Sequence, residues 1–365
     1  MTGVFPEFSP DAGYVVEPPR SPRPIVIVGA GGIVRDAHLP AYAKAGLPVI
    51  GIVDRDAERA AELAKTYGIE HVFASVADAV GFAPADTVYD VAVPPAHIVE
   101  VLEPLPDGAA VLIQKPLGDT EQSTDAIIRL CHVKGLTAAV NTQLRFAPYV
   151  AAARAAIAEG MIGELYDLEV QVEVNTPWEL FPYVLGLDRL ELHMHSIHYL
   201  DLVRSFVGDP ASVSCVTVRH PRKAHANSRS AVLLHYPERD LRAVVTTNHD
   251  HHFGPRHEQS YVKWEGTEGA IKAQLGLLMA YPEGREDSLE IFRDTDPDAG
   301  WQPLPFEGSW FPDAFVGSMG VLQRYLEGSI DTLPTSVDDV QHTMAVVEAA
   351  YASNERGGVV PNYRP

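Results

Sequence analysis

Residues 24–34 read PIVIVGAGGIV, a run of β-branched residues that passes directly into a glycine-rich turn. A continuous apolar run of this kind is typical of a strand buried on both faces of a parallel sheet. The spacing Gly29-x-Gly31-x-x-Val34 follows at once, and then comes an amphipathic stretch that ends at Gly46. This order of strand, turn and helix is that of a Rossmann dinucleotide-binding motif, so it restricts this part of the chain to one class of fold.

Short apolar runs alternate with helical stretches as far as about residue 146. Further strands are expected at 47–54, 88–94, 109–116 and 136–143, and helices at 31–46, 55–68, near 95–104 and at 120–134. Tight connections between alternating strands and helices predict a doubly wound parallel sheet. The first part of the chain is therefore expected to be an α/β Rossmann domain.

The pattern changes beyond residue 146. After a helix at 147–160, longer runs alternate apolar and polar residues, as half-buried strands of an antiparallel sheet do. These runs are 165–175, 211–220, 229–237, 241–249 and 260–266, with a hairpin turn at 237–240 and helices at 189–207 and 336–355. We expect an α+β domain with a largely antiparallel, open-faced sheet, and a large uncovered face favours a homodimer or homotetramer.

Length and this change of pattern predict the domain organisation. A chain of 365 residues suits two domains of roughly 100–200 residues each. We expect a proline-rich, acidic arm over residues 1–22, a dinucleotide-binding domain over 23–146, and a substrate-binding and oligomerisation domain over 147–365.

Charge and cysteine content exclude several classes of partner. The chain carries 28 basic and 49 acidic residues, a formal net charge of −21, which argues against nucleic acid and anionic membranes. No stretch approaches the ~20 apolar residues of a membrane span, and the N-terminus lacks the pattern of a signal peptide. The two cysteines, Cys131 and Cys215, form no paired motif, so a cytoplasmic protein without disulfides is expected.

The glycine turn and the end of the second strand predict how a dinucleotide binds. Gly29 permits a tight turn, Gly31 lets the backbone approach a pyrophosphate, and the helix N-terminus offers N–H donors. The third position holds Val34, where the full motif has a small residue. Asp54 follows the turn by about 20 residues, where a carboxylate accepts hydrogen bonds from the ribose hydroxyls and repels a 2′-phosphate. NAD is therefore favoured, and NADP stays open because the adjacent Arg55 could receive that phosphate.

Beyond these patterns, the chain resembles the Gfo/Idh/MocA family of sugar and polyol dehydrogenases. The resemblance runs from about residue 24 to the C-terminus and rests on the order of several motifs. They are GAGGIVRDAHLPAY, YDVAVPPAHIVEVL, VLIQKPLGDT, NTQLRFAPY, EGMIGEL, HSIHYLDLVRSFVGDP and WEGTEGAI. The family pairs an N-terminal dinucleotide fold with a C-terminal open-faced sheet, in agreement with the periodicity.

The resemblance implies a central catalytic role for Lys115. The family's Glu-Lys-Pro occurs here as Gln114-Lys115-Pro116, and a cis bond before the proline is expected. Lys115 ends a parallel strand, where open α/β sheets bind their ligands. Its ammonium would bind the substrate hydroxyl and stabilise the oxyanion that develops as hydride leaves. The alternative is a lysine that only reaches the surface from a strand end.

Three histidines, His193, His195 and His198, fall within the segment ELHMHSIHYLD. The resemblance identifies His198 as the residue that exchanges the proton of the hydroxyl, and an imidazole with a pKa of ~6.5 suits that task. The family's acid four residues earlier is Met194 here, so His195, or less favourably Glu191, is expected to take its role. Helical i, i+3 spacing would place His195 and His198 on one face, whereas His193 is expected to point elsewhere.

Further contacts follow from the same motifs. The cofactor is expected to contact Gly29, Gly31, Gly32, Ile33, Asp54, Arg55, Val93, Pro94, His97, Gln114, Lys115 and Asn141. The substrate is expected to contact Lys115, Gln143, Arg145, Trp178, Tyr183, His195 and His198. The alternative for the aromatic residues at 176–183 is loop packing without a ligand.

A second histidine cluster, NHDHHFGPRH at 248–257, raises the possibility of a metal site. Alternation along a strand would send His249 and His251 to one face, where their imidazoles suit zinc or manganese. The resemblance implies hydride transfer without a metal ion, so no metal is expected.

Together these features predict an NAD-dependent dehydrogenase that oxidises a secondary hydroxyl of a sugar, an inositol or a related polyol. Two alternatives remain open at this point. One is a glycosidase that uses bound NAD for transient oxidation. The other is a non-catalytic NAD-binding sensor, which the departures Gln114 and Met194 would suit.

Overall fold

The computed structural model describes residues 17–180, 184 and 186–358. The predicted contact Tyr183 and most of the expected arm lie outside the described residues. The chain forms two compact units, each made of two segments: Met1–Gly160 with Leu304–Met344, and Met161–Pro303 with Ala345–Pro365. The domain boundary after residue 146 remains a prediction.

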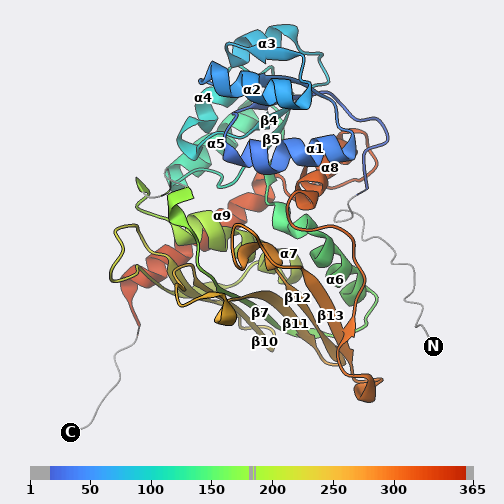
Figure 1. Cartoon of the computed structure of the whole chain (residues 1–365), viewed down its shortest axis with the longest axis vertical. Coiled ribbons are helices and arrows are strands. Elements are labelled where there is room, and N and C mark those ends of the chain that lie inside the picture. The colour runs from blue at the N-terminus through green and yellow to red at the C-terminus, as the bar shows by residue number, and fades with distance from the viewer. Residues whose placement is uncertain (1–16, 181–183, 185, 359–365) are drawn as a thin grey trace. The chain divides into compact units, whose positions relative to one another are not determined.

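The first unit is built on a six-stranded parallel sheet (Figure 1). Its strands are β1 (Ile25–Val28), β2 (Val49–Val53), β3 (His71–Phe73), β4 (Val88–Val91), β5 (Ala110–Gln114) and β6 (Thr137–Asn141). They lie in the order β3-β2-β1-β4-β5-β6, and every pair is parallel. This order joins two mononucleotide-binding halves between β1 and β4, so the prediction of a Rossmann sheet is confirmed.

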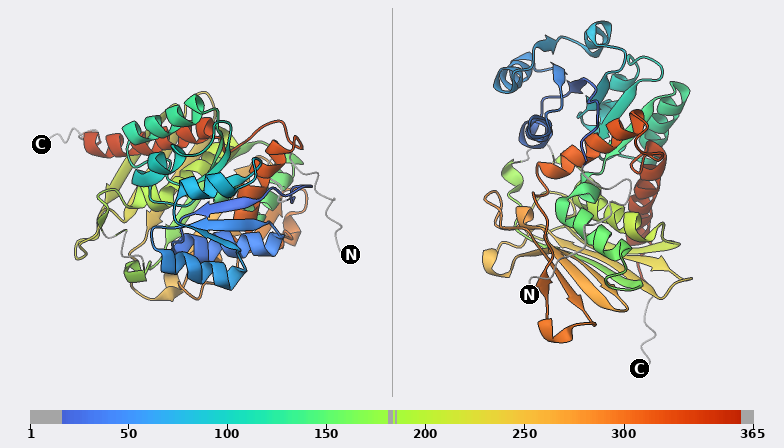
Figure 2. Two further views of the ribbon diagram at one scale, coloured as in Figure 1. Left: turned by 90° about the horizontal axis from the view of Figure 1, so that it is seen from above. Right: turned by 90° about the vertical axis from the view of Figure 1, so that its right-hand side faces the viewer.

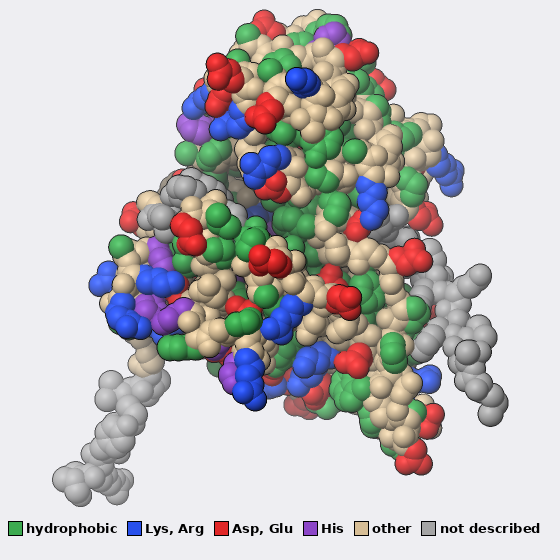
Figure 3. Space-filling model, viewed as in Figure 1, with side chains coloured by type: hydrophobic (Ala, Val, Ile, Leu, Met, Phe, Trp, Pro, Cys, Tyr) green, Lys and Arg blue, Asp and Glu red, His purple; other side chains and the backbone are tan. Residues whose placement is uncertain are grey.

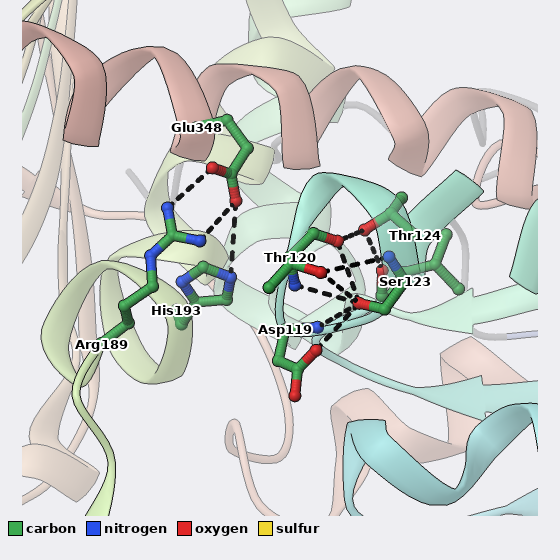
Figure 4. A network of polar contacts seen from close by, with 8 residues as sticks. Asp119, Thr120, Ser123, Thr124, Arg189, His193 and Glu348 are labelled. Carbon is green, nitrogen blue, oxygen red and sulfur yellow. Dashed lines mark hydrogen bonds and ion pairs between the residues drawn. The ribbon is translucent and has the colours of Figure 1, made fainter. Parts of the chain in front are cut away.

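Helices of the first unit begin and end at residues that the sequence marks. They are α1 (Leu39–Ala45), α2 (Ala57–Tyr67), α3 (Val76–Phe82), α4 (Ile98–Leu102), α5 (Glu121–Val133), α6 (Pro148–Ala158) and α8 (Asp313–Leu326). The Asp56 carboxylate accepts from the Arg59 N–H and caps α2, and a capping box of Thr120 and Ser123 starts α5 (Figure 4). Gly46 and Gly68 end α1 and α2 in the left-handed conformation.

The helices α1 and α8 contact each other and pack on the same core of the parallel sheet. Residues 17–22, the described end of the predicted arm, and the following Arg23 lie against α8 and its C-terminal end. The backbone N–H groups of Arg20 and Ser21 donate to Glu327, and that of Arg23 donates to Gln323. This part of the chain is therefore held by the first unit.

The second unit is built on an eight-stranded mixed sheet (Figure 2). Its strands are β7 (Leu165–Glu173), β8 (Ser212–Val218), β9 (Arg229–Tyr236), β10 (Leu241–Asn248), β11 (Gln259–Gly266), β12 (Gly269–Gln274), β13 (Ser288–Arg293) and β14 (Gln302–Pro303). The order is β14-β13-β12-β11-β7-β10-β9-β8, with β7 and β10 parallel and the other pairs antiparallel. The largely antiparallel sheet and its hairpin at 237–240 are confirmed.

One face of this sheet packs on helices and the other is open. The helix α7 (Ile197–Val207) contacts β10, and the end of α9 (Val337–Arg356) hydrogen bonds the edge strand β8 through Ser353 and Asn354. Along β8 the buried Cys215 alternates with the exposed Val216. Alternation of this kind is what a sheet with one solvated face requires.

Short helical turns connect these elements. Among the described residues, η1 (Val34–His38) and η6 (Leu192–Ser196) are π turns. The 3-10 turns of the described residues include η2 (Pro95–His97), η3 (Gln143–Phe146), η4 (Trp178–Leu180), η7 (Pro255–His257), η8 (Gly276–Leu278) and η9 (Pro297–Ala299).

Several elements were not expected from the sequence: β3, α3, β12, β13, β14 and α8. The strand β3 has only three residues, too few for a periodic signal. The helix α8 contains Gly317 and Gly320, which lower helix propensity, but its buried face packs on the sheet and packing decides its conformation. The strand β10 ends at Asn248, so the expectation that strand alternation orients His249 and His251 was wrong.

Candidate active site

The glycine-rich turn leaves β1 with the geometry that a pyrophosphate site needs. Gly29 has φ +113°, and a Cβ there would lie 2.3 Å from the Ala92 carbonyl oxygen, so only glycine fits. At Gly31 an added Cβ would meet no atom within 4 Å, which leaves room for a ligand to approach the backbone. Gly29 is therefore required by the packing of the turn against Ala92, whereas Gly31 leaves the backbone accessible to a ligand.

A helical turn begins directly behind these glycines. The N–H groups of Val34 and Arg35 both donate to the Gly31 carbonyl, at 3.1 Å. Gly32 and Ile33 precede them at the exposed N-terminal end, where helix N–H groups lack intrahelical acceptors and favour an anion. Val34 is fully buried in the core, so the larger third residue of the motif is accommodated.

Asp54 links the end of β2 to the glycine turn. Its carboxylate accepts from the Ala30 N–H at 2.5 Å, from the Asp56 N–H at 2.7 Å and from Arg59 at 2.7 Å. These three bonds, two from backbone N–H groups and one from a guanidinium, fix the position of the carboxylate. Ribose binding by Asp54 remains a prediction that this fixed position suits.

Arg55 extends across the surface to the predicted loop beside the cofactor. Its guanidinium donates to Glu100 at 2.7 Å and lies 3.4 Å from His97. The hydrogen bond from Arg55 holds the pKa of Glu100 below its ordinary value. Val93 and Pro94 lead into the 3-10 turn that carries His97.

Lys115 follows the last residue of β5, at the carboxyl edge of the parallel sheet. The bond from Lys115 to Pro116 is cis, as expected, and the Lys115 N–H donates to the Gln114 side chain at 3.0 Å. Desolvation lowers the pKa of the Lys115 ammonium to about 8. A lysine with such a pKa holds and releases a proton near neutral pH, which is what acid–base catalysis needs.

Three polar residues at the end of β6 are buried. The Asn141 amide lies 3.3 Å from His38, whose other ring nitrogen is 2.6 Å from Asp90. Gln143 is buried in η3. Arg145 is also buried, and its guanidinium donates to Asp339 at 2.6 Å and to the Pro334 carbonyl at 2.7 Å. The cofactor contact of Asn141 and the substrate contacts of Gln143 and Arg145 remain predictions.

The segment ELHMHSIH forms the π turn η6 and the start of α7. His193 points toward α9, where its Nε2 is 3.9 Å from Glu348 beside the Arg189 ion pair with the same carboxylate (Figure 4). His198 lies in the first turn of α7 and is buried. The helical i, i+3 argument assumed an unbroken α-helix, whereas the π turn changes the phase between His195 and His198.

His195 belongs to a cluster of rings. It stacks on His249 with ring centroids 4.1 Å apart, and Trp178 packs on it at 5.4 Å. Trp178 is only 4% exposed and also contacts His225 at 5.1 Å. The predicted substrate contact Trp178 therefore packs mainly on histidine rings of the same unit.

Asp250 binds two rings of this cluster, Trp178 and His225. Its buried carboxylate accepts from Trp178 Nε1 at 3.2 Å, from His225 at 3.1 Å, from Lys223 at 2.8 Å and from Ser228. Burial opposes ionisation of Asp250, but the hydrogen bonds from Lys223, Ser228 and His225 outweigh it and hold its pKa well below the ordinary value.

The remaining histidines of this region lie nearer the surface. His252 lies 3.3 Å from Arg222 and packs edge-on to His220, and His251 is 3.2 Å from Glu173. Figure 3 shows histidine and basic side chains gathered together on one side of the view. Among residues 17–180, 184 and 186–358, no group of three His, Cys, Asp or Glu side chains is arranged to hold a metal ion.

Sequence reasoning missed the buried set His38, Asp90 and Tyr42, where Tyr42 donates to Asp90 at 2.8 Å. It named Glu191 as a less favoured candidate, but not its buried partners Ser196 and Ser230. The signal available was a polar residue inside an apolar run, such as Asp90 in VYDVAVP, but it does not reveal the partner.

Comparison with known proteins identifies the family of this chain. Residues 23–142 match a family described as an oxidoreductase family with an NAD-binding Rossmann fold, and residues 150–272 match the GFO/IDH/MocA C-terminal domain. The chain belongs to the Gfo/Idh/MocA family. It is an oxidoreductase whose first unit carries an NAD-binding Rossmann fold, as the sequence predicted.

One relative matches nearly the whole chain, and another matches about half of it. The D-apiose dehydrogenase of Paraburkholderia graminis is 25% identical over 342 residues, which cover 92% of this chain and 88% of that protein. A 1,5-anhydro-D-fructose reductase of Ensifer adhaerens is 32% identical over 197 residues, 52% of this chain and 59% of that protein.

Solved structures share the fold. An oxidoreductase from Agrobacterium radiobacter in complex with NAD+, L-tartaric acid and magnesium superposes with a TM-score of 0.75 at 22% identity, covering 93% of this chain and 98% of that one. Levoglucosan dehydrogenase in complex with NADH and levoglucosan gives 0.74 at 19% identity, covering 92% and 98%. Within the described residues, no helix is both long and apolar enough to cross a membrane.

Proposed function

We propose that this oxidoreductase removes hydride from a secondary hydroxyl of a carbohydrate or cyclic polyol. The observation that carries the proposal is Lys115, a desolvated ammonium at the carboxyl edge of an NAD-binding sheet. Ligands of open α/β sheets bind at this edge. The relatives named for D-apiose and for 1,5-anhydro-D-fructose support a carbohydrate as the substrate class.

The residues of the first unit fit a dinucleotide. Gly31 offers open backbone, the turn at Gly32 and Ile33 offers N–H donors, and Asp54 offers a carboxylate for ribose hydroxyls. Bound NAD supplies the nicotinamide carbon that accepts the hydride. NAD is the proposed cofactor. NADP remains an option to test, because Arg55 and Arg59 both lie near the Asp54 turn.

Lys115 and His198 carry the proposed proton chemistry. The Lys115 ammonium donates a hydrogen bond to the substrate oxygen and stabilises its developing negative charge. The His198 imidazole accepts the hydroxyl proton, and its place in the first turn of a buried helix restricts its orientation. His195 is proposed to contact the substrate beside it.

The test is a substrate panel followed at the NADH absorbance with NAD and NADP in parallel. It contains D-apiose, anhydro sugars, inositols, aldoses and uronates. Lys115→Met is the matched variant, which must bind NAD but form NADH at least about 10²-fold more slowly. If a nitrophenyl glycoside releases nitrophenol without net NADH and no substrate of the panel forms NADH, the glycosidase alternative replaces the proposal.

The open face of the eight-stranded sheet supports a homo-oligomer. Val216 on β8 and Leu233 on β9 are 62% and 44% exposed on neighbouring strands of this face. Light scattering should give a dimer or tetramer, and Val216→Glu with Leu233→Glu should shift it to the monomer. The two described cysteines are free and buried, which suits a reducing cytoplasm.

A further inference from the structure

His249 occupies the space directly beneath His195. It follows the last residue of β10, is 1% exposed, and its Nδ1 lies 3.0 Å from the Thr176 hydroxyl. Its ring lies 24° from parallel to the His195 ring, with centroids 4.1 Å apart. A buried ring fixed by its own hydrogen bond restricts the plane that His195 can adopt.

A second ring limits His195 from another element. Trp178 approaches the His195 ring at an interplanar angle of 56°. Trp178 cannot easily move, because its Nε1 donates to the buried Asp250 at 3.2 Å. His195 is therefore contacted by rings from the end of β10 and from the turn η4.

Glu191 links the π turn that carries His195 to β9 and lies beside His249. Ser196 donates to Glu191 at 2.7 Å across five residues, the spacing of a π turn, and Ser230 of β9 donates to the same carboxylate. A Glu191 oxygen is also 3.8 Å from His249 Nε2. One buried carboxylate thus anchors the π turn and lies beside the ring that supports His195.

We infer that His249 is a positioning residue, which holds the His195 imidazole in the orientation in which it meets the substrate. The inference rests on the proposed function, because that function places His195 at the substrate.

The charges around the stack agree with this role. Desolvation lowers the pKa of His249 to about 4, so its ring is neutral at neutral pH. A neutral His249 ring therefore places no cation 4.1 Å from the His195 ring. The other ionisable groups of the cluster are Glu191, which flanks His249, His225 and Asp250, which lie against Trp178, and Lys223, which pairs with Asp250.

The experiment compares His249→Ala, which removes the ring, with His249→Phe, which keeps a flat ring. Misplacement of a substrate-contacting group by about 1 Å costs up to 10²-fold in rate, so we expect kcat to fall about 10-fold or more in H249A. H249F should stay within about threefold of the parent, and the dissociation constant of NAD should be unchanged in both.

A second readout does not depend on turnover. In 15N-histidine-labelled protein, the His195 ring signals, assigned with His195→Gln, should shift and broaden in H249A and remain sharp in H249F. If H249A does not fold, as thermal melting would show, His249→Leu replaces it because it fills the volume without an aromatic face.

Two results would overturn the inference: unchanged kcat and unchanged His195 signals in H249A, or equal damage in H249F and H249A. The ring signals also separate this failure from failure of the proposed function. If no substrate of the panel forms NADH but the His195 signals respond as expected, the proposed function fails and the positioning role stands.

Discussion

The glycine turn of the first unit and the histidine cluster of the second differ in where their polar groups come from. In the turn, backbone N–H groups and the conformations of Gly29 and Gly31 make the site, and Asp54 is held by backbone donors. In the cluster, side chains from several elements contact one another: His195 stacks on His249, and Asp250 bonds Trp178 and His225. A site made by backbone follows from local spacing, whereas a site made by side chains follows from tertiary packing.

Substitution of Lys115 is the strongest test of this contrast. Lys115 contributes a side chain at the carboxyl edge of the parallel sheet, in the unit whose glycine turn is made by backbone groups. Lys115→Met should lower kcat by about 10²–10³-fold, since an electrostatic donor to the developing oxyanion is lost. The affinity for NAD, measured by fluorescence titration, should change less than threefold. Equal losses in NAD binding and kcat would mean that Lys115 holds the cofactor instead of the reacting oxygen.

The pH dependence of kcat tests whether the positive charge of Lys115 is needed for turnover. The folded-state pKa of Lys115 is about 8, below its ordinary value of 10.5, so the ammonium loses its proton as the pH rises through about 8. We expect kcat to fall above that pH. In Lys115→Arg the guanidinium stays charged, and the residual activity should lack this alkaline decline.

A substitution in the histidine cluster should change the stability of the fold. Asp250→Asn removes the charge that accepts from Lys223, His225 and Trp178, and should lower the free energy of unfolding by about 2–3 kcal/mol at pH 7. Because the folded-state pKa lies below the ordinary value of 3.8, the stabilisation is present above that value and is lost as the pH falls through the folded-state pKa. Urea melts should therefore converge for the two proteins in acid, and a constant gap would contradict the ionised carboxylate.

Substitutions of the two glycines of the turn should have different effects: one should lower folding stability and the other should weaken NAD binding. Gly29→Ala places a Cβ 2.3 Å from the Ala92 carbonyl at a positive φ, and should cost about 1–3 kcal/mol of folding stability. Gly31→Ala meets no neighbour, so its melting temperature should stay that of the parent while NAD binding weakens about tenfold. Unchanged NAD binding in Gly31→Ala would show that the pyrophosphate does not approach there.

The smallest effect is expected at the surface. Glu100→Gln removes the carboxylate that pairs with Arg55, and should improve the affinity for NADP a few-fold while leaving NAD binding unchanged. Arg55→Gln in the same background is the control and should reverse the gain. Exposed pairs contribute little energy, so a shift beyond about fivefold would indicate a further contact.

The same contrast explains how far the sequence could predict the molecule. The strands and helices of the Rossmann sheet, the tight turn at Gly29 and the place of Lys115 at a strand end could be predicted, because the signal for each lies in a short local pattern of residues. The stack of His195 on His249 joins residues more than fifty positions apart, and the spacing of either segment carries no sign of the other. The π turn at Leu192–Ser196 depends on Glu191 and Ser196 meeting inside the core, so a helical pattern alone could not foresee it.

The position of α8 in the chain has a consequence for how the protein is made. Residues Leu304–Met344 belong to the first unit although they follow the entire second sheet in sequence. Phe315, Met319 and Leu322 of α8 complete the core that Ile25 and Ile27 of β1 begin. A chain is synthesised from its N-terminus, so the first unit is begun first but is complete only after Leu304–Met344 have been synthesised. A nascent or truncated chain ending before residue 304 would carry an intact glycine turn on a sheet with part of its apolar face bare, and would depend on chaperones until α8 emerged.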